Sequence, residues 1–111
     1  MNHPIEIDVV TLRDRLAENA DLLLIDCREP DEWQVARIES ATLMPMSEIA
    51  SRFEEINKAG SDRPVVVYCH HGGRSLRVTQ WLREQGLTHA SSLAGGIDAW
   101  SEQIDPSVPR Y

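Results

Sequence analysis

The sequence predicts an α/β fold, in which a central, mainly parallel sheet of four to five strands carries helices on both faces. Residues 22–25 and 65–67 are continuously apolar, as is typical of parallel strands that are covered on both sides. Segments with helical periodicity alternate with such runs along the chain, and this alternation favours a parallel sheet. The 111 residues suffice for one compact domain, so we expect a single domain over residues 1–111.

The first half of the chain is predicted to form strands and helices in turn. Leu12 and Leu16 are four residues apart and therefore share one helix face. Pro30 suits the first turn of a short helix, because its missing N–H would have no partner there. The expected elements are a strand over 5–9, a helix over 11–19, a strand over 22–25, a helix over 29–35 and a strand over 41–44.

The second half continues the alternation. Met46, Ile49, Phe53 and Ile56 recur at helical spacing, and Ser47 is placed to cap that helix. The expected elements are one helix over 46–56, a strand over 65–67, a helix over 76–85, a strand over 90–93, a last helix after a Gly-Gly turn, and an extended tail from Pro106.

Composition excludes several classes of function. With 11 basic and 18 acidic residues, the net charge is −7, which argues against a nucleic-acid-binding surface. No apolar run approaches the length of a membrane span, so we expect no membrane contact. The N-terminus lacks a secretory signal pattern and the chain has two cysteines, which favours a reducing compartment, the cytoplasm, over a disulfide scaffold. We expect no cofactor.

Residues 64–75 carry the strongest chemical signal. An apolar strand ends in Cys69, and Gly72 and Gly73 let the backbone curl so that successive N–H groups point at one centre. These N–H groups, the start of the following helix and Arg74 all favour a thiolate over a thiol. We therefore predict that Cys69 is a nucleophile inside a cradle for anions.

The rest of this loop is predicted to bind the substrate. Arg74 either folds back to stabilise the loop or faces the mouth and holds an anionic donor. The two histidines are expected at the rim, where they can add pH-dependent charge or contact substrate. A zinc site of Cys69 with these histidines is unfavourable, because consecutive loop residues rarely chelate one ion, so we expect no metal. The predicted binding residues are His70, His71, Gly72, Gly73, Arg74 and Ser75.

Three stretches, in the right order along the chain, carry a family resemblance. Residues 69–75, Cys-His-His-Gly-Gly-Arg-Ser, resemble the active-site loop of the rhodanese-like sulfurtransferases. Residues 26–33 are similar to that family's Asp-x-Arg-Glu-Pro-x-Glu-aromatic segment, and residues 95–100 to its Gly-Gly-x-x-x-Trp segment. The ending over 103–111 resembles one subgroup, in which the domain follows an E1-like adenylyltransferase that charges ubiquitin-like sulfur-carrier proteins.

The resemblance implies a reaction and its partners. Cys69 would attack a sulfane-sulfur donor, become a persulfide, and pass the outer sulfur to a thiol, cyanide or a protein. A small anionic donor such as thiosulfate, a persulfide-donor protein and a sulfur-carrier protein are the implied partners. Asp26 and Arg28 would brace the loop, with a surface ion pair as the alternative. Cys27 is either a resolving thiol or a buried structural residue.

Other functions stay open. Phosphatases of the same fold family have an arginine-ended cysteine loop, but four residues separate Cys69 from Arg74 here, against five there. The smaller cradle suits one sulfur atom better than a phosphoryl group. A use similar to arsenate reductase would need a resolving thiol such as Cys27. A non-catalytic binding module is common where the loop cysteine is lost, and the presence of Cys69 counts against it.

Overall fold

A computed structural model describes residues 3–18 and 21–111, so the predicted helix end at Asn19 lies outside the described residues. It contains one five-stranded sheet in the order β1-β5-β4-β2-β3, and every neighbouring pair is parallel. The prediction of a parallel sheet is therefore confirmed. The strands are β1 (Glu6–Ile7), β2 (Leu23–Asp26), β3 (Thr42–Leu43), β4 (Val65–Tyr68) and β5 (Ala90–Leu93).

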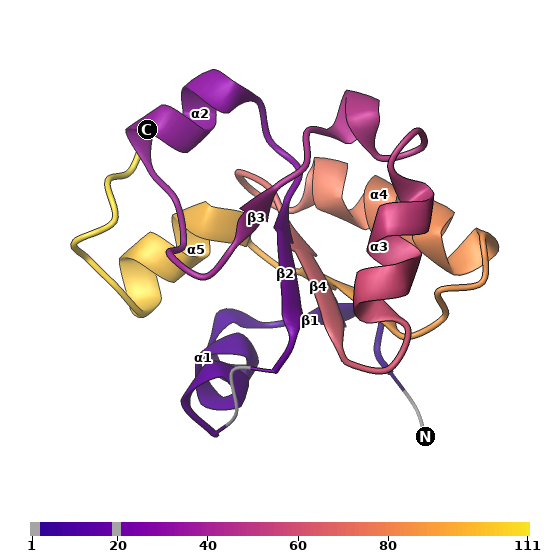
Figure 1. Cartoon of the computed structure of the whole chain (residues 1–111). Coiled ribbons are helices and arrows are strands. Elements are labelled where there is room, and N and C mark those ends of the chain that lie inside the picture. The colour runs from indigo at the N-terminus through magenta and orange to yellow at the C-terminus, as the bar shows by residue number, and fades with distance from the viewer. Residues whose placement is uncertain (1–2, 19–20) are drawn as a thin grey trace.

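Helices cover both faces of this sheet, as the sequence predicts. Figure 1 shows α1 and α5 on one side and α3 and α4 on the other, with α2 beside the end of the chain. Their bounds are α1 (Val9–Glu18), α2 (Pro30–Val35), a 3₁₀ helix η1 (Met46–Glu48), α3 (Phe53–Gly60), α4 (Gly73–Glu84) and α5 (Gly96–Gln103). No helix in the described part of the chain is long and apolar enough to cross a membrane.

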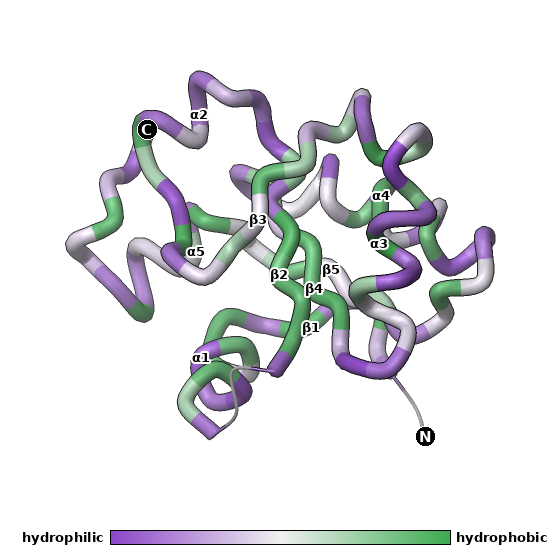
Figure 2. Tube along the Cα trace, viewed as in Figure 1, coloured by the Kyte–Doolittle hydropathy of each residue, from purple (hydrophilic) through white to green (hydrophobic). Residues whose placement is uncertain are grey.

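The hydrophobic core is divided in two by the sheet. Successive strand residues point to opposite faces, so the apolar runs of β2 and β4 fill both halves. Figure 2 shows these two strands as a hydrophobic centre. The half under α1 and α5 includes Leu12, Leu24, Val66, Tyr68, Leu93, Ile97 and Trp100. The half under α3 and α4 includes Ile25, Cys27, Ile56, Val67, Cys69, Val78 and Leu82.

Two predicted boundaries, one at the start of the chain and one at the loop that follows Cys69, need correction. The first strand ends at Ile7, because the Asp8 side chain accepts the N–H of Thr11 at 2.8 Å and so starts α1 at Val9. The helix expected over 76–85 begins earlier, at Gly73. The loop after β4 is consequently short, and the helix N-terminus lies next to it.

The single helix predicted over 46–56, with Ser47 as its cap, is wrong. Ser47 lies inside η1, and α3 begins only at Phe53, with Arg52 in the capping position. Ile49, which directly follows η1, and Ile56 in α3 both reach the core under α3 and α4, so the spacing of the apolar residues does not reveal the break between the two helices. The helical spacing of apolar residues indicates which residues are buried, but it does not indicate where one helix ends and the next begins.

The tail after α5 packs against the domain. Val108 is buried in the core half under α1 and α5, and its carbonyl accepts the hydroxyl of Ser101. Arg110 forms ion pairs with Asp98 and Glu102. The tail therefore runs back toward the carboxyl ends of the strands, where the predicted site residues lie.

Candidate functional site

Cys69 follows the last residue of β4 and is enclosed, with 1% of its surface exposed. Its Sγ accepts the backbone N–H of Gly72 at 3.1 Å and that of Ser75 at 3.4 Å, and lies 3.5 Å from the Ser75 hydroxyl. Gly72 has φ 111, a conformation that favours glycine, and it precedes the first residue of α4. The positive end of this helix is thereby aimed at the sulfur.

The backbone of the loop is held from behind by the N-terminus of α5. Ile97 N donates to the carbonyl of Cys69 at 2.9 Å, and Asp98 N donates to the carbonyl of His70 at 3.1 Å. A Cβ on Gly96 would come within 2.4 Å of both carbonyl oxygens. Because the carbonyls point back to α5, the N–H groups on the other side of the turn are free to face the sulfur.

Arg74, predicted either to fold back and stabilise the loop or to hold an anionic donor at the mouth, pairs with an acidic side chain of α2. Its two terminal nitrogens donate to the carboxylate of Glu32 in α2, at 2.7 and 2.9 Å. The Arg74 bonds, and then those from Tyr111 and Glu29 N, hold the pKa of Glu32 at about 2. Glu32 was not predicted as a site residue, although the spacing of Glu29 and Glu32 is that of a capping box.

Asp26 and Arg28 form a fully buried ion pair, so the alternative of a surface pair is wrong. Arg28 Nη2 lies 2.6 Å from Asp26 Oδ2, and both side chains are inaccessible. The guanidinium also donates to the carbonyl of Ala36 and to the hydroxyl of Tyr111, each within 2.7 Å. The pair thus ties β2 to the end of α2 and to the tail, and it connects to Glu32 through Tyr111.

Three aromatic rings are stacked at the rim of the loop. The ring of His70 lies between those of His71 and Tyr111, with centroids 4.0 Å apart on each side. Asp98 offers a third potential metal ligand within 4.8 Å of the histidine nitrogens. The two histidine rings are only 17° from parallel, however, so their in-plane nitrogen lone pairs lie in nearly parallel planes and converge poorly on one ion. Arg110 also bonds both oxygens of the Asp98 carboxylate.

The sequence of this chain is similar to those of known proteins. The profile of the rhodanese-like domain matches residues 8–103. The chain belongs to the rhodanese-like domain family. A protein of Allochromatium vinosum named as a sulfurtransferase is 42% identical over 103 residues, covering 93% of this chain and 94% of that protein. Relatives of this rhodanese-like chain are thus named for sulfur transfer in general.

Two further comparisons bear on the context of the domain. The probable adenylyltransferase/sulfurtransferase MoeZ of Mycobacterium tuberculosis is 40% identical over 100 residues, which cover 90% of this chain but only 25% of MoeZ. A rhodanese-related protein from Thermoplasma volcanium superposes with a TM-score of 0.82 at 26% identity, covering 97% of this chain and all of that one. The rhodanese fold therefore covers nearly the whole chain, whereas MoeZ is a much longer protein.

Cys27 lies close to Cys69 in this rhodanese-like domain. Its N–H donates to the carbonyl of Tyr68, which continues the β2–β4 register, and both cysteines belong to the core half under α3 and α4. Both are free thiols. Burial, with a smaller contribution from Cys69, raises the pKa of Cys27 to about 12. Cys27 is therefore a protonated thiol at neutral pH.

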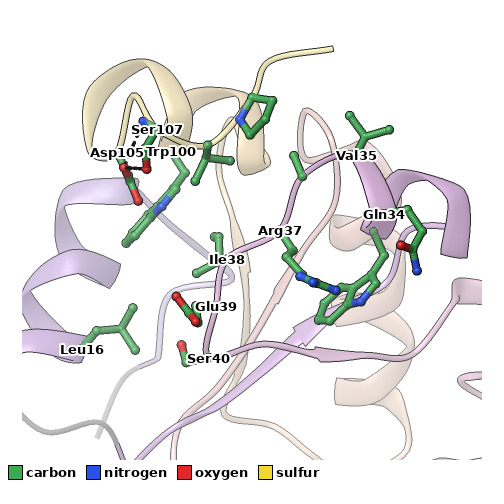
Figure 3. A pocket seen from close by; sticks show the side chains of 14 residues that line it. Leu16, Gln34, Val35, Arg37, Ile38, Glu39, Ser40, Trp100, Asp105 and Ser107 are labelled. Carbon is green, nitrogen blue, oxygen red and sulfur yellow. Dashed lines mark hydrogen bonds between the residues drawn. The ribbon is translucent and has the colours of Figure 1, made fainter.

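Figure 3 shows residues that line an open pocket of about 890 Å³. It is bordered by α2, by the segment 36–40, by Trp100 of α5 and by the tail. Arg37 lies over the Trp33 ring at 4.9 Å within this border. Its lining, among the described residues, includes none from the loop 69–75, so it does not contribute to the chemistry at Cys69.

Proposed function

We propose that this rhodanese-like chain is a sulfurtransferase that carries sulfane sulfur as a persulfide on Cys69. The supporting observation is the pair of backbone N–H groups, from Gly72 and Ser75, that point at Sγ. Such donors stabilise negative charge on sulfur, whether it is the thiolate or the persulfide. The names of the relatives support sulfur transfer as the class of reaction.

The proposed reaction has two displacements on sulfur. The Cys69 thiolate attacks the outer sulfur of thiosulfate, a new S–S bond forms, and sulfite leaves with the electron pair of the broken bond. An acceptor nucleophile then attacks the outer sulfur of the persulfide. With cyanide the products are thiocyanate and the original thiolate, so the cycle needs no oxidant or reductant.

The residues around Cys69 have distinct proposed roles. The loop over 70–75 binds the donor, with its N–H groups facing the transferred sulfur. Arg74 fixes the loop to α2 through Glu32. Asp26 and Arg28 support the site indirectly, because their bonds lead to the loop through Tyr111 and Glu32.

The proposed physiological setting follows from two observations. Two free, buried cysteines suit a reducing compartment, and we place the protein in the cytoplasm. Similarity to one part of MoeZ favours, as acceptor, a sulfur-carrier protein whose C-terminal carboxylate is activated as an acyl-adenylate, for cofactor synthesis or RNA thiolation. The persulfide would displace AMP from the activated carbonyl, and an added thiol reductant would cleave the resulting acyl disulfide to give the carrier thiocarboxylate. A mixture of the persulfide form with such a carrier that shows neither complex nor sulfur transfer would remove this acceptor.

Intact-protein mass spectrometry after incubation with thiosulfate tests the central proposal. We expect an added mass of one sulfur on the wild type, reversed by cyanide, absent in Cys69→Ser and retained in Cys27→Ser. An adduct that survives in Cys69→Ser would show that Cys27, and not Cys69, carries the sulfur. No adduct with thiosulfate or with a persulfide donor would favour the reductase, phosphatase or binding-module alternatives.

A further inference from the structure

The arginines next to the candidate site are already neutralised by carboxylates. Arg74 gives both terminal nitrogens to Glu32, and Arg28 is paired with Asp26. Each pair adds one positive and one negative charge, so neither leaves a net cation for a bound donor. In the proposed reaction, the attacking Cys69 thiolate adds a negative charge of its own.

A third arginine, at the rim of the loop, is also neutralised by carboxylates. Arg110 bonds both carboxylate oxygens of Asp98 and also approaches Glu102 at 3.3 Å. Burial, and then the neighbouring His71, lower the pKa of His70, which keeps that ring neutral at pH 7. A doubly charged donor therefore approaches a site where Arg28, Arg74 and Arg110 are already paired with carboxylates.

We propose that Glu32 is a specificity-determining residue of the transfer reaction, which neutralises Arg74 and thereby disfavours doubly charged sulfur donors relative to singly charged ones. The proposal rests on the persulfide function of Cys69. The preferred donors are those with at most one negative charge around the transferable sulfur, as in organic thiosulfonates and persulfides of thiols. Thiosulfate remains a substrate, but a poor one.

The position of Glu32 is well determined by its contacts. One carboxylate oxygen accepts Arg74 Nη1 and the N–H of Glu29, and the other accepts Arg74 Nη2 and the hydroxyl of Tyr111. Its side chain is only 17% exposed. Such a carboxylate stays ionised and fixed beside Arg74, so its field acts on every donor that enters. The effect scales with the charge of the donor.

Two donors that deliver the same sulfur test this dependence on charge. Thiosulfate is a dianion and releases sulfite, whereas benzenethiosulfonate is a monoanion and releases benzenesulfinate; each leaves the same persulfide on Cys69. The variant Glu32→Gln removes the charge and keeps a carbonyl oxygen for the N–H of Glu29. The matched control is Asp31→Asn, which removes one charge from an exposed neighbour in the same helix.

We expect kcat/KM, measured with cyanide as acceptor at low salt, to rise about threefold per unit of donor charge in Glu32→Gln. Thiosulfate then gains about tenfold and benzenethiosulfonate about threefold, so that their ratio shifts about threefold. Asp31→Asn leaves the ratio of the two donors unchanged. In the wild type, the same ratio rises toward thiosulfate as salt screens the repulsion.

Three results would overturn the inference. They are a fall of thiosulfate activity in Glu32→Gln, an unchanged donor ratio, and an equal shift in Asp31→Asn. If Glu32→Gln does not fold, the salt dependence of the wild type tests the inference instead. A ratio of kcat/KM for the two donors that does not change with salt would then contradict it. Persulfide formation by both donors with an unchanged ratio refutes only this inference, whereas no persulfide from either donor refutes the proposed function itself.

Discussion

The ring of Tyr111 lies parallel to the ring of His70, with centroids 4.0 Å apart and planes 9° from each other. This contact joins the end of the tail to the residue that follows Cys69. The Tyr111 hydroxyl extends the contact, since it donates to Glu32 and accepts from Arg28. The tail is therefore part of the wall of the candidate site.

The stacking should be visible in the titration of His70. Burial lowers the pKa of His70 below 6.5, and removal of the covering ring in Tyr111→Ala should move it back up. Tyr111→Phe keeps the stack and should leave the pKa near the wild-type value. NMR titration of the His70 ring protons measures both, and equal shifts in the two variants would contradict the role of the ring.

The same lowered pKa has a consequence for stability. Because the unfolded chain binds a proton more readily than folded His70, wild-type stability is lost as pH falls below about 6.5. The loss continues until the pH reaches the pKa of folded His70. In Tyr111→Ala the two pKa values are closer, so chemical denaturation should show a shallower decline between pH 7 and 5.

Much of the fold could be predicted because its signals are local. The runs that became β2 and β4 are apolar throughout, and β5 was predicted with its observed bounds, Ala90–Leu93. The cysteine loop could be singled out for the same reason, because its cysteine, its glycines and the start of the following helix are contiguous in the sequence. The order of the strands and the bend between η1 and α3 depend on packing between distant segments, which periodicity does not report.

The missed parts of the site are those that come from distant segments. Glu32 and Arg74 are 42 positions apart, and neither sequence neighbourhood predicts that they pair. Tyr111 stood in a tail predicted only as extended, and its partner Glu32 lies 79 positions away. Long-range pairs of this kind form because the fold brings the first turn of α4 and the tail to α2, and Figure 1 shows the C-terminus beside α2.

Ser75→Ala should weaken both the loop and the chemistry. The buried Ser75 hydroxyl donates to the carbonyl of Gly72, lies 2.8 Å from the hydroxyl of Ser92 and adjoins the sulfur of Cys69. Its loss leaves buried polar groups without a partner, which costs about 1–3 kcal/mol of unfolding free energy. The rate of persulfide formation should fall roughly tenfold, because the bond from this hydroxyl to the Gly72 carbonyl holds the turn whose N–H groups face the sulfur.

Ser92→Ala separates these two effects. It removes the neighbouring hydroxyl in β5 but leaves Ser75 in place beside Cys69, so stability should fall while the rate of sulfur loading changes little. Stopped-flow kinetics and urea denaturation of both variants provide the comparison. An equal loss of rate in Ser92→Ala would assign the effect to loop disorder instead of to the Ser75 hydroxyl.

Cys27→Ala should still be loaded with sulfur. A pKa of about 12 keeps Cys27 protonated at neutral pH, so it is a poor nucleophile despite its position near Cys69. Iodoacetamide at pH 7 should therefore modify Cys69 and spare Cys27, as peptide mapping would show. The substitution should cost about 1 kcal/mol through the small cavity that it leaves. Loss of turnover with a retained fold would instead identify Cys27 as a resolving thiol.

Gly96→Ala should be among the most damaging small substitutions in the protein. The added Cβ would lie 2.4 Å from the carbonyl oxygens of Cys69 and His70, and the backbone there has φ 60. The two hydrogen bonds from α5 to these carbonyls would have to lengthen, so the cost should exceed about 2 kcal/mol. Displacement of these carbonyls would turn the opposing N–H groups away from the sulfur of Cys69. The rate of persulfide formation should therefore fall together with the stability.

Gly73→Ala is the matched comparison, because a Cβ at Gly73 meets nothing within 4 Å. Gly73 also lies in the first turn of α4 without a positive φ, so alanine there should stabilise the protein by about 0.5 kcal/mol. Thermal denaturation of the two variants should thus give opposite shifts from the same chemical change. Similar shifts would mean that the contact between α5 and the loop does not hold the cysteine in place.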